Sequence, residues 1–465
     1  MISLSLSEIA GITGGTLHDV PDPAVRLTAP SVCDSRETVP GGMFAAISGE
    51  HVDGHDYAAA AIGAGAVCVL AARPVGVPAV VVPDVVAALG ALARAVGRRI
   101  GATVVGVTGS AGKTSTKDLL AQVLERHGPT VATARSFNTE VGLPLTALRA
   151  DESTRYLVLE MGARRIGHIR YLAGLVPPAV GLVVNVGTAH LGEFGSRAAI
   201  AAAKGELVEA LPDAAGGGLA VLNADDDMVA AMAGRTAARV VMYGRAARAD
   251  VRADDIEVDG GRARFSLSAG GESAPVALQF LGEHQVSNAL GAAAVAWGLG
   301  IAVPAIAAAL SDARPRAAGR LEVTERQDGV TVINDAFNAN PESVRAALKT
   351  LASIADGRRK VAVLGEMAEL GDATRQGHED AGRLAADLGI DVLLAVGGEE
   401  AEAAAAAAVA RGGRLRAVVV PDARAALAVL QDLLMPGDVV LAKASHAMHL
   451  EELAVTLAAA GGPAT

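Results

Sequence analysis

A glycine-rich loop with a lysine and neighbouring hydroxyl side chains gives the strongest chemical signal in the sequence. Residues 106–115 read Gly-Val-Thr-Gly-Ser-Ala-Gly-Lys-Thr-Ser, after an apolar run at 102–105 and before a helix-like segment at 117–124. Glycines let backbone N–H groups surround an anion, and a helix N-terminus and a lysine add positive charge, so this order predicts a phosphate site. Thr114 stands where a hydroxyl can bind the magnesium of a nucleotide. The predicted nucleotide-binding residues are Thr108, Gly109, Ser110, Ala111, Gly112, Lys113, Thr114 and Ser115.

The loop departs from the usual P-loop spacing at one position. Val107 occupies the place of the first glycine, and the nearest glycine is one residue earlier. A Gly-Lys-Thr sequence alone is common, and an ordinary glycine turn is the alternative. The strand-like run before the loop and the helix-like segment after it favour nucleotide binding.

Polar residues also follow two apolar runs of the same region. Glu160 closes the run at 156–159, and His190 comes shortly after the run at 180–186. Ligands of open α/β sheets gather at the carboxyl ends of strands, so we interpret Glu160 as a magnesium ligand rather than a carboxylate facing water. The local pattern leaves His190 open between a metal ligand and a structural histidine. It gives Lys204 no role beyond that of a solvated helix lysine.

A cluster of Asn and Asp side chains lies between the apolar run at 330–333 and Pro341. Proline suits the first turn of a helix, and Asn and Asp supply turn and capping groups. A purely structural turn would explain this cluster. The same side chains at the end of a strand could also bind the ribose of a nucleotide or a polar substrate; they include Asp335, Asn338 and Asn340.

Strand-like and helix-like segments alternate along the chain, which predicts an α/β fold. A length of 465 residues is too great for one core. We place domains at 1–98, 99–314 and 315–465. Period-two alternation between 249 and 280, with glycine pairs at 260–261 and 270–271, predicts antiparallel hairpins. In the last domain, apolar runs predict a doubly wound pattern with strands at 330–333, 360–364, 392–396, 418–420 and 439–441.

Composition narrows the class of protein. The formal net charge of -11 argues against a nucleic-acid partner, because binding phosphate backbones needs basic patches. Cys33 and Cys68 fit no metal or redox spacing and predict reduced thiols. No basic segment precedes an apolar core at the start, and the Ala-rich stretch at 58–72 is too short to span a bilayer. We therefore expect a soluble, cytoplasmic protein without membrane insertion.

Taken together in order and spacing, these motifs resemble the Mur ligase family of bacterial cell-wall synthesis over nearly the whole chain. No single motif decides the resemblance. Its first half rests on Asp34-Ser35-Arg36, Gly49-Glu50, Asp53-Gly54-His55, the loop at 109–114, Asn138-Thr139-Glu140, Glu160-Met161-Gly162, His190 and Lys204-Gly205-Glu206. Its second half rests on Gly282-Glu283-His284, Asn288, Gly319-Arg320, Asp335, Asn338-Ala339-Asn340-Pro341 and Leu364-Gly365-Glu366-Met367.

The resemblance implies three domains: a small N-terminal α/β domain that binds a UDP-sugar, a central P-loop ATPase-like domain with a parallel sheet, and a C-terminal Rossmann-like domain. It implies a monomeric ligase that uses ATP and Mg²⁺ to join D-alanyl-D-alanine to UDP-N-acetylmuramoyl-tripeptide through an acyl phosphate.

The resemblance also assigns roles to individual residues. The implied catalytic residues are Lys113, Glu160, His190 and Lys204, and the implied metal ligands are Thr114, Glu160, His190 and a carbamylated Lys204. Asn288 would lie near the adenine, Arg320 on the phosphates and Asp335 on the ribose side. The implied substrate-binding residues are Ser35, Arg36, Asn138, Thr139, Asn338 and Asn340.

Three departures from the family pattern stand in the last domain. Phe337 and Asn334 replace a common Tyr and Asp, and residues 443–446 read Lys-Ala-Ser-His instead of Lys-Gly-Ser-Arg, which leaves that loop without a role. The nearest alternatives are a sibling that adds the third amino acid and a folylpolyglutamate synthase. The more remote one is a regulatory P-loop ATPase. The turn at 338–341 with the motif at 364–367 favours a dipeptide-adding member. Whether the tripeptide ends in diaminopimelate or lysine stays open.

Overall fold

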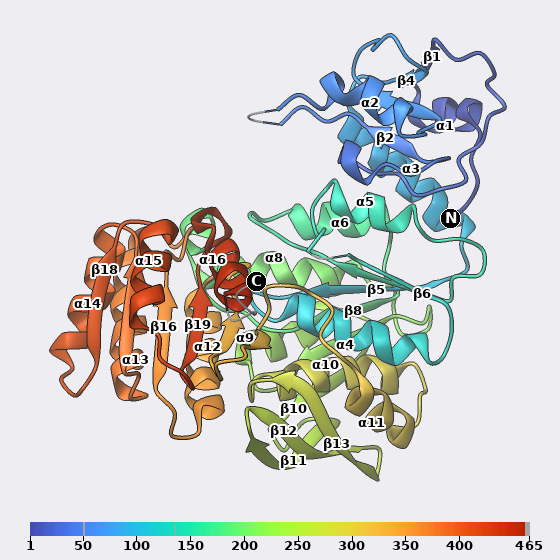
Figure 1. The fold of residues 1–465 in the computed structure, drawn as a ribbon. Helices are drawn as coiled ribbons and strands as arrows, with labels where there is room; N and C mark the ends of the chain where they lie inside the picture. Colours follow the sequence, from blue (N-terminus) through green and yellow to red (C-terminus); the bar gives the residue numbers. More distant parts are fainter. Residues whose placement is uncertain (50–51, 135, 461–465) are drawn as a thin grey trace.

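Three β-sheets follow one another along the chain and confirm the expected three-part α/β architecture (Figure 1). The computed structural model describes residues 1–49, 52–134 and 136–460, so Glu50 of the Gly49-Glu50 motif lies outside the described residues. Helices cover the faces of each sheet. None of the helices in these described ranges is long and apolar enough to cross a membrane.

The N-terminal sheet has four strands in the order β1-β4-β3-β2, and only the pair β1 and β4 is antiparallel. Ser5 begins the first helix with a capping box: its hydroxyl accepts the N–H of Glu8, whose carboxylate accepts the N–H of Ser5. The strands are β1 (Thr16–His18), β2 (Met43–Ala45), β3 (Cys68–Ala71) and β4 (Ala79–Val81). The helices are α1 (Leu6–Thr13), α2 (Ala58–Gly63) and α3 (Val85–Arg99).

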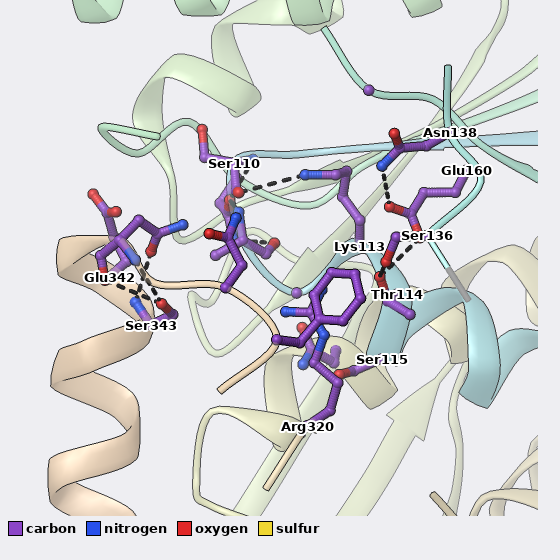
Figure 2. A pocket seen from close by; sticks show the side chains of 18 of the residues that line it. Ser110, Lys113, Thr114, Ser115, Ser136, Asn138, Glu160, Arg320, Glu342 and Ser343 are labelled. Carbon is purple, nitrogen blue, oxygen red and sulfur yellow. Dashed lines mark hydrogen bonds between the residues drawn. The ribbon is translucent and has the colours of Figure 1, made fainter. Parts of the chain in front are cut away.

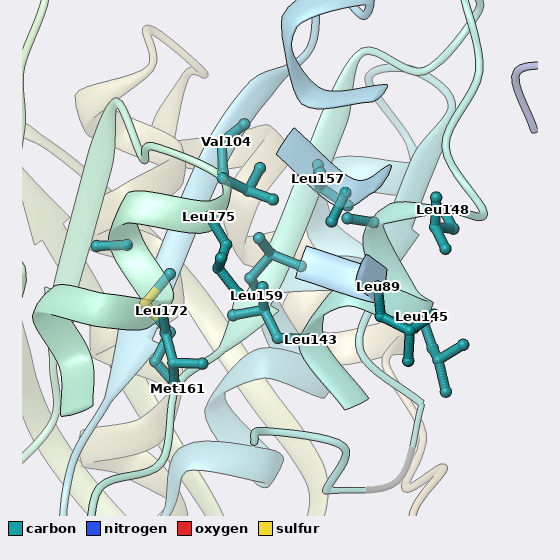
Figure 3. Packing of buried hydrophobic residues seen from close by; sticks show 14 of the residues in the cluster. Leu89, Val104, Leu143, Leu145, Leu148, Leu157, Leu159, Met161, Leu172 and Leu175 are labelled. Atoms are coloured by element: carbon teal, nitrogen blue, oxygen red, sulfur yellow. The ribbon is translucent and has the colours of Figure 1, made fainter. Parts of the chain in front are cut away.

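Helix α3 joins this first unit to the central one. Its Leu89 belongs to the same buried cluster as Leu143, Leu172 and Leu175 of the central unit (Figure 3). Burying one such leucine side chain stabilises the fold by about 1.5–3 kcal/mol. Gly90 lets Leu175 approach, because a Cβ there would lie 2.9 Å from a Leu175 methyl carbon. An apolar junction therefore anchors the N-terminal unit to the central one.

The central sheet has nine strands in the order β13-β12-β11-β10-β9-β8-β5-β7-β6. Its parallel strands are β5 (Thr103–Thr108), β6 (Thr130–Ala132), β7 (Tyr156–Glu160), β8 (Val180–Val183), β9 (Leu219–Asn223) and β10 (Arg239–Gly244). The expected hairpins are confirmed as β11 (Val251–Asp259), β12 (Arg262–Ala269) and β13 (Glu272–Leu281). Because β11 pairs in parallel with β10, the hairpins extend the main sheet rather than forming a separate one.

Helices pack on both faces of this central sheet. Helix α10 lies buried between the parallel strands and the hairpins (Figure 1). The helices are α4 (Lys113–Glu125), α5 (Gly142–Ala147), α6 (His168–Leu175), α7 (Leu191–Phe194), α8 (Arg197–Glu209), α9 (Asp227–Ala230), α10 (Gln285–Gly298) and α11 (Val303–Asp312).

The C-terminal sheet has six strands in the order β14-β15-β19-β16-β17-β18. The five strands expected from apolar runs are present as β15 (Thr331–Asn334), β16 (Lys360–Leu364), β17 (Val392–Val396), β18 (Arg416–Val420) and β19 (Val439–Lys443). The antiparallel edge strand β14 (Glu322–Glu325) was not predicted, because its charged and mostly exposed residues give no apolar run. The covering helices are α12 (Pro341–Ala355), α13 (Thr374–Asp387), α14 (Glu399–Ala410), α15 (Ala423–Leu433) and α16 (Leu450–Ala459).

Candidate active site

A cavity of about 580 Å³ lies where the central and C-terminal units meet (Figure 2). It collects strand ends and helix starts from both, so one ligand in it would touch both units. The sequence-predicted residues that line it are Ser110, Ala111, Gly112, Lys113, Thr114, Ser115, Asn138, Thr139, Glu160, His190, Lys204, Asn288, Arg320, Asp335, Asn338 and Asn340.

The glycine-rich loop connects β5 to α4 in the predicted order. Gly112 immediately precedes α4 with φ 77°, a left-handed conformation that glycine adopts without strain. A Cβ at Gly112 would also lie 2.5 Å from Oδ1 of Asn288 on α10. Asn288 therefore packs directly against the loop.

Asn185, which the sequence analysis did not select, holds the loop from the other side. Its Oδ1 accepts the backbone N–H groups of Ser110 and Ala111, both at 2.9 Å, and its Nδ2 donates to the carbonyl of Ala111 at 3.0 Å. The signal that could have identified it is its place just after β8. Three bonds from one side chain fix the loop before any ligand arrives.

Lys113 begins α4 and bends back over the loop. Its Nζ donates to the carbonyl of Gly109 at 2.8 Å. Burial lowers the pKa of Lys113, while the nearby charge of Glu160 acts in the opposite direction. A carbonyl contact of this kind is readily exchanged for a phosphate oxygen, which is a stronger partner for an ammonium group.

Glu160 lies at the end of β7, buried among oxygen and amide groups (Figure 2). The Thr114 hydroxyl donates to its Oε2 at 2.9 Å, and Asn138 Nδ2 donates to its Oε1 at 2.7 Å. The Ser136 hydroxyl is 3.1 Å from that of Thr114. A carboxylate and two hydroxyls beside a phosphate loop form the oxygen-rich set that suits Mg²⁺.

Lys204 is not a solvated helix lysine: it lies on α8, with 3% of its surface exposed, and lines the cavity. Burial, aided by the charge of Lys113, lowers its pKa well below the ordinary value. His190 lines the same cavity, and burial, aided by the charge of Lys113, lowers its pKa to about 4. An amine that readily loses its proton and a neutral imidazole are both potential nucleophiles or ligands.

The C-terminal unit supplies the wall of the cavity that faces the phosphate loop. Lys443, at the end of β19, donates to Asp335 Oδ2 at 2.6 Å and to the carbonyl of Asn338 at 2.9 Å. Asp335 Oδ1 accepts the N–H of Leu321 at 3.1 Å. The guanidinium carbon of Arg320 stands 4.2 Å from the centre of the Phe337 ring, a cation–π contact that fixes both side chains beside the cavity.

Lys443 therefore gives the segment at 443–446 a structural part that the sequence left open. It is a buried cation that holds the Asp335 turn in place. Asn340 continues this turn as the N-cap of α12, where its side chain accepts the N–H of Ser343 at 2.9 Å. The polar cluster before Pro341 thus acts as a helix start and lines the cavity at the same time.

Four of the predicted binding residues do not line this cavity. The Thr108 hydroxyl is buried and donates to the carbonyl of Met161 at 2.9 Å, and Gly109 contributes the carbonyl that Lys113 contacts. Ser35 and Arg36 lie in a short 3-10 helix of the N-terminal unit. Arg36 is exposed and forms a two-point ion pair with Asp34.

Sequence reasoning also missed Glu342 and His284, which line the cavity from α12 and from the residue before α10. Burial lowers the pKa of His284 to about 4. Both residues stand inside or beside motifs that carried the resemblance. Their positions on helix starts were the available signal.

Comparison with known proteins places this geometry in a family. Residues 32–104 match the Mur ligase family catalytic domain, 107–296 the Mur ligase middle domain, and 319–446 the domain described as Mur ligase, glutamate ligase domain. The UDP-N-acetylmuramoyl-tripeptide–D-alanyl-D-alanine ligase of Mycobacterium tuberculosis is 48% identical over 99% of this chain and 98% of its own.

Solved structures agree with the sequence comparison. MurF from Acinetobacter baumannii superimposes with a TM-score of 0.85 at 32% identity, covering 99% of both chains. MurF ligase from Thermotoga maritima in complex with ADP superimposes with a TM-score of 0.77 at 30% identity, covering 93% of this chain and 97% of its own. The phosphate loop, the three sheets in their order and these matches along nearly the whole sequence lead to one conclusion: this chain belongs to the Mur ligase family.

Proposed function

We propose that this enzyme is the ATP-dependent ligase that adds D-alanyl-D-alanine to UDP-N-acetylmuramoyl-tripeptide in the synthesis of peptidoglycan precursors. The observation that carries the proposal is that the phosphate loop and the Asp335–Asn340 wall of the C-terminal unit line one and the same cavity. Relatives named for this activity match 99% of the chain in Mycobacterium tuberculosis and 85% of it in Escherichia coli. ATP and a UDP-linked precursor are cytoplasmic metabolites, so we place the reaction in the cytoplasm.

The chemistry requires activation of a carboxylate, which is a poor electrophile. Transfer of the γ-phosphoryl group of ATP to the terminal carboxylate of the tripeptide gives an acyl phosphate and ADP. The free amine of the dipeptide then attacks the acyl carbon, and the tetrahedral intermediate expels inorganic phosphate. Closure of the cavity keeps water away from the acyl phosphate, which water would otherwise hydrolyse.

Lys113 and the N-terminus of α4 would bind the phosphates during the phosphoryl transfer. Lys113 exchanges its contact with Gly109 for the phosphates, and the helix end places further N–H groups toward them. Such charges, fixed before the reaction begins, stabilise the transferring group without reorganisation. Arg320, held against Phe337 at the cavity wall, is the second cation that we assign to the phosphates.

The oxygen-rich set around Glu160 fits magnesium, and we assign Thr114 and Glu160 as its ligands. Magnesium, when bound, neutralises charge on the phosphates. Lys204 and His190 would hold a second ion. The lowered pKa of Lys204 supports this assignment, because the neutral amine is the form that adds to carbon dioxide, releasing a proton and leaving a carbamate. Carbamylation turns a buried cation into a carboxylate ligand.

We further propose that the units 1–98, 99–314 and 315–465 act as the UDP-sugar, ATP and acceptor domains of one chain. Ser35 and Arg36 would contact the UDP-sugar, an assignment supported by their position in the N-terminal unit, away from the cavity. Asn138 and Thr139 would contact the tripeptide, and Asn338 and Asn340 the incoming dipeptide. The long UDP-linked substrate then runs from the N-terminal unit to the phosphate loop.

The test is an ADP-release assay across UDP-muramoyl peptides and acceptors. We expect ADP release only when both the tripeptide nucleotide and D-alanyl-D-alanine are present, with preference for either diaminopimelate or lysine as third residue. ADP release that favours a UDP-muramoyl dipeptide with a single amino acid would indicate the sibling ligase. ADP release independent of any acceptor would indicate a regulatory ATPase.

A further inference from the structure

We propose that Glu342 and Glu369 of the C-terminal unit are positioning residues that hold residues 187–192 of the central unit in the conformation that places His190 in the cavity. This inference rests on the proposed function, because it concerns the role of His190 in that reaction. Docking of the C-terminal unit would then complete the catalytic site as well as deliver the acceptor.

The first contact is made by Glu342, in the first turn of α12. Its Oε1 accepts both the backbone N–H of Thr188, at 2.9 Å, and the Thr188 hydroxyl, at 3.0 Å. The carboxylate lies directly over Gly187, where a Cβ would be 2.6 Å from the carboxyl carbon. Oε2 is buried without a hydrogen-bond partner. One carboxylate thus holds Thr188, two residues before His190, through two hydrogen bonds.

The second contact is made by the turn around Glu369. Oε2 of Glu369 lies 2.5 Å from Nδ1 of His190, although the two groups are not aligned as a hydrogen bond, and Oε1 lies 3.6 Å from the Arg164 guanidinium. The carbonyl of Glu369 accepts the N–H of Gly192 at 3.0 Å. A side chain at Gly192 would place its Cβ 2.8 Å from the backbone nitrogen of Gly371, so this approach requires glycine.

The backbone on both sides of this contact is unusual. His190 has φ 61° and Glu369 has φ 66°, in the left-handed region that non-glycine residues seldom adopt. Such conformations persist when surrounding contacts hold them. The central unit fixes the start of the segment, where the N–H of Val186 donates to Asp226 at 2.8 Å. The contacts with Glu342 and Glu369 come from the C-terminal unit, so undocking removes them together.

A double-mutant cycle tests whether Glu369 acts through His190. Glu369→Ala should lower turnover with D-alanyl-D-alanine by about tenfold to a hundredfold in the wild-type background, the scale expected for a misplaced catalytic group. In a His190→Ala background it should cost less than about threefold, because the group it positions is gone. Equal losses in both backgrounds would overturn the inference.

Glu342 has a conservative variant that separates positioning from charge. Glu342→Ala removes the acceptor for Thr188 and should lower turnover, whereas Glu342→Gln keeps an oxygen acceptor and should recover most of the loss. Glu399→Ala is the matched control, since Glu399 is an exposed carboxylate on α14 of the same unit. Turnover of Glu342→Ala equal to that of Glu399→Ala would contradict the proposal.

Small-angle X-ray scattering of the full chain with ADP gives a readout that does not depend on activity. Glu342→Ala/Glu369→Ala should have a larger radius of gyration than the wild type and Glu399→Ala, with an unchanged urea midpoint. A scattering curve identical to that of the control would refute docking through these residues. Failure of the wild type to use D-alanyl-D-alanine would instead refute the proposed function, and the scattering result would stand apart from it.

Discussion

Replacement of Lys204 is the perturbation with the clearest structural basis. Lys204→Ala removes a buried amine from the cavity, and with it the carboxylate that carbamylation would supply. Loss of one fixed charge contact to the transition state lowers turnover on the order of a hundredfold or more. We expect this loss in an assay of ADP release with both substrates, and partial recovery when formate or acetate is added. Lys204→Arg should not recover, because a guanidinium is not carbamylated and fills the space.

The stability of the same variants gives an independent measurement. Burial lowers the pKa of Lys204 in the folded state, so the unfolded chain binds its proton more tightly. Each unit by which the folded pKa lies below the unfolded pKa costs the folded state about 1.4 kcal/mol at a pH below both values. The cost diminishes as pH rises toward the ordinary lysine pKa. Lys204→Met, which keeps the volume without the charge, should therefore have an unfolding free energy at neutral pH equal to or above that of the wild type in carbon-dioxide-free buffer.

Removal of carbon dioxide tests the carbamate without any mutation. Enzyme prepared in carbon-dioxide-free buffer should lose turnover and regain it when bicarbonate is added, while Lys204→Ala should not respond to bicarbonate. Full turnover of Lys204→Ala would refute the reasoning and return the residue to a packing role.

Three further predictions concern the phosphate loop, the opposite wall and pH. Lys113→Ala should lower turnover by about a hundredfold or more with little change in the urea midpoint. The control Lys349→Ala, at an exposed lysine of α12, should match the wild type. Near-normal turnover of Lys113→Ala would remove the P-loop assignment. Lys443→Met leaves the Asp335 carboxylate buried and without its cation, and should lower the unfolding free energy in urea titrations by about 3–5 kcal/mol. The double variant Lys443→Met/Asp335→Asn should restore much of that loss. Equal losses in the single and the double variant would exclude the ion pair as the cause. The pKa of His284 is lowered to about 4, so the unfolded chain takes up its proton first as pH falls, and stability should decrease between pH 6.5 and 4 by at most about 1.4 kcal/mol per pH unit from this residue. His284→Gln should flatten that part of the stability curve, and an unchanged slope would contradict the shift.

The sequence predicted those parts of the site that depend on local order. The phosphate loop, Glu160 at a strand end and the polar turn before Pro341 each follow an apolar run, so their positions at carboxyl ends of strands could be anticipated. Asn185 follows the same rule and was overlooked because a lone asparagine has no distinctive spacing. Lys204 could not be placed from spacing, because its burial depends on which face of α8 meets the cavity.

Contacts between residues far apart in the sequence were beyond local reasoning. Lys443 meets Asp335 across 108 residues of chain, and Glu342 meets Thr188 across 154. Nothing in either neighbourhood indicates its partner, since the first pair forms only when β15 and β19 pair and the second only where the C-terminal unit meets the central one. The charged edge strand β14 was missed for a related reason: pairing with β15 stabilises it, although its own residues show no apolar pattern.

The acyl phosphate is the central claim, and an isotope experiment tests it directly. The tripeptide nucleotide is prepared with oxygen-18 in its terminal carboxylate and turned over with ATP and D-alanyl-D-alanine, and the released phosphate is analysed by mass spectrometry. If the carboxylate attacks the γ-phosphorus, one labelled oxygen must appear in the inorganic phosphate, and the nucleotide product must be ADP. Phosphate free of label, with the displaced labelled oxygen found in water or in AMP instead, would contradict the account.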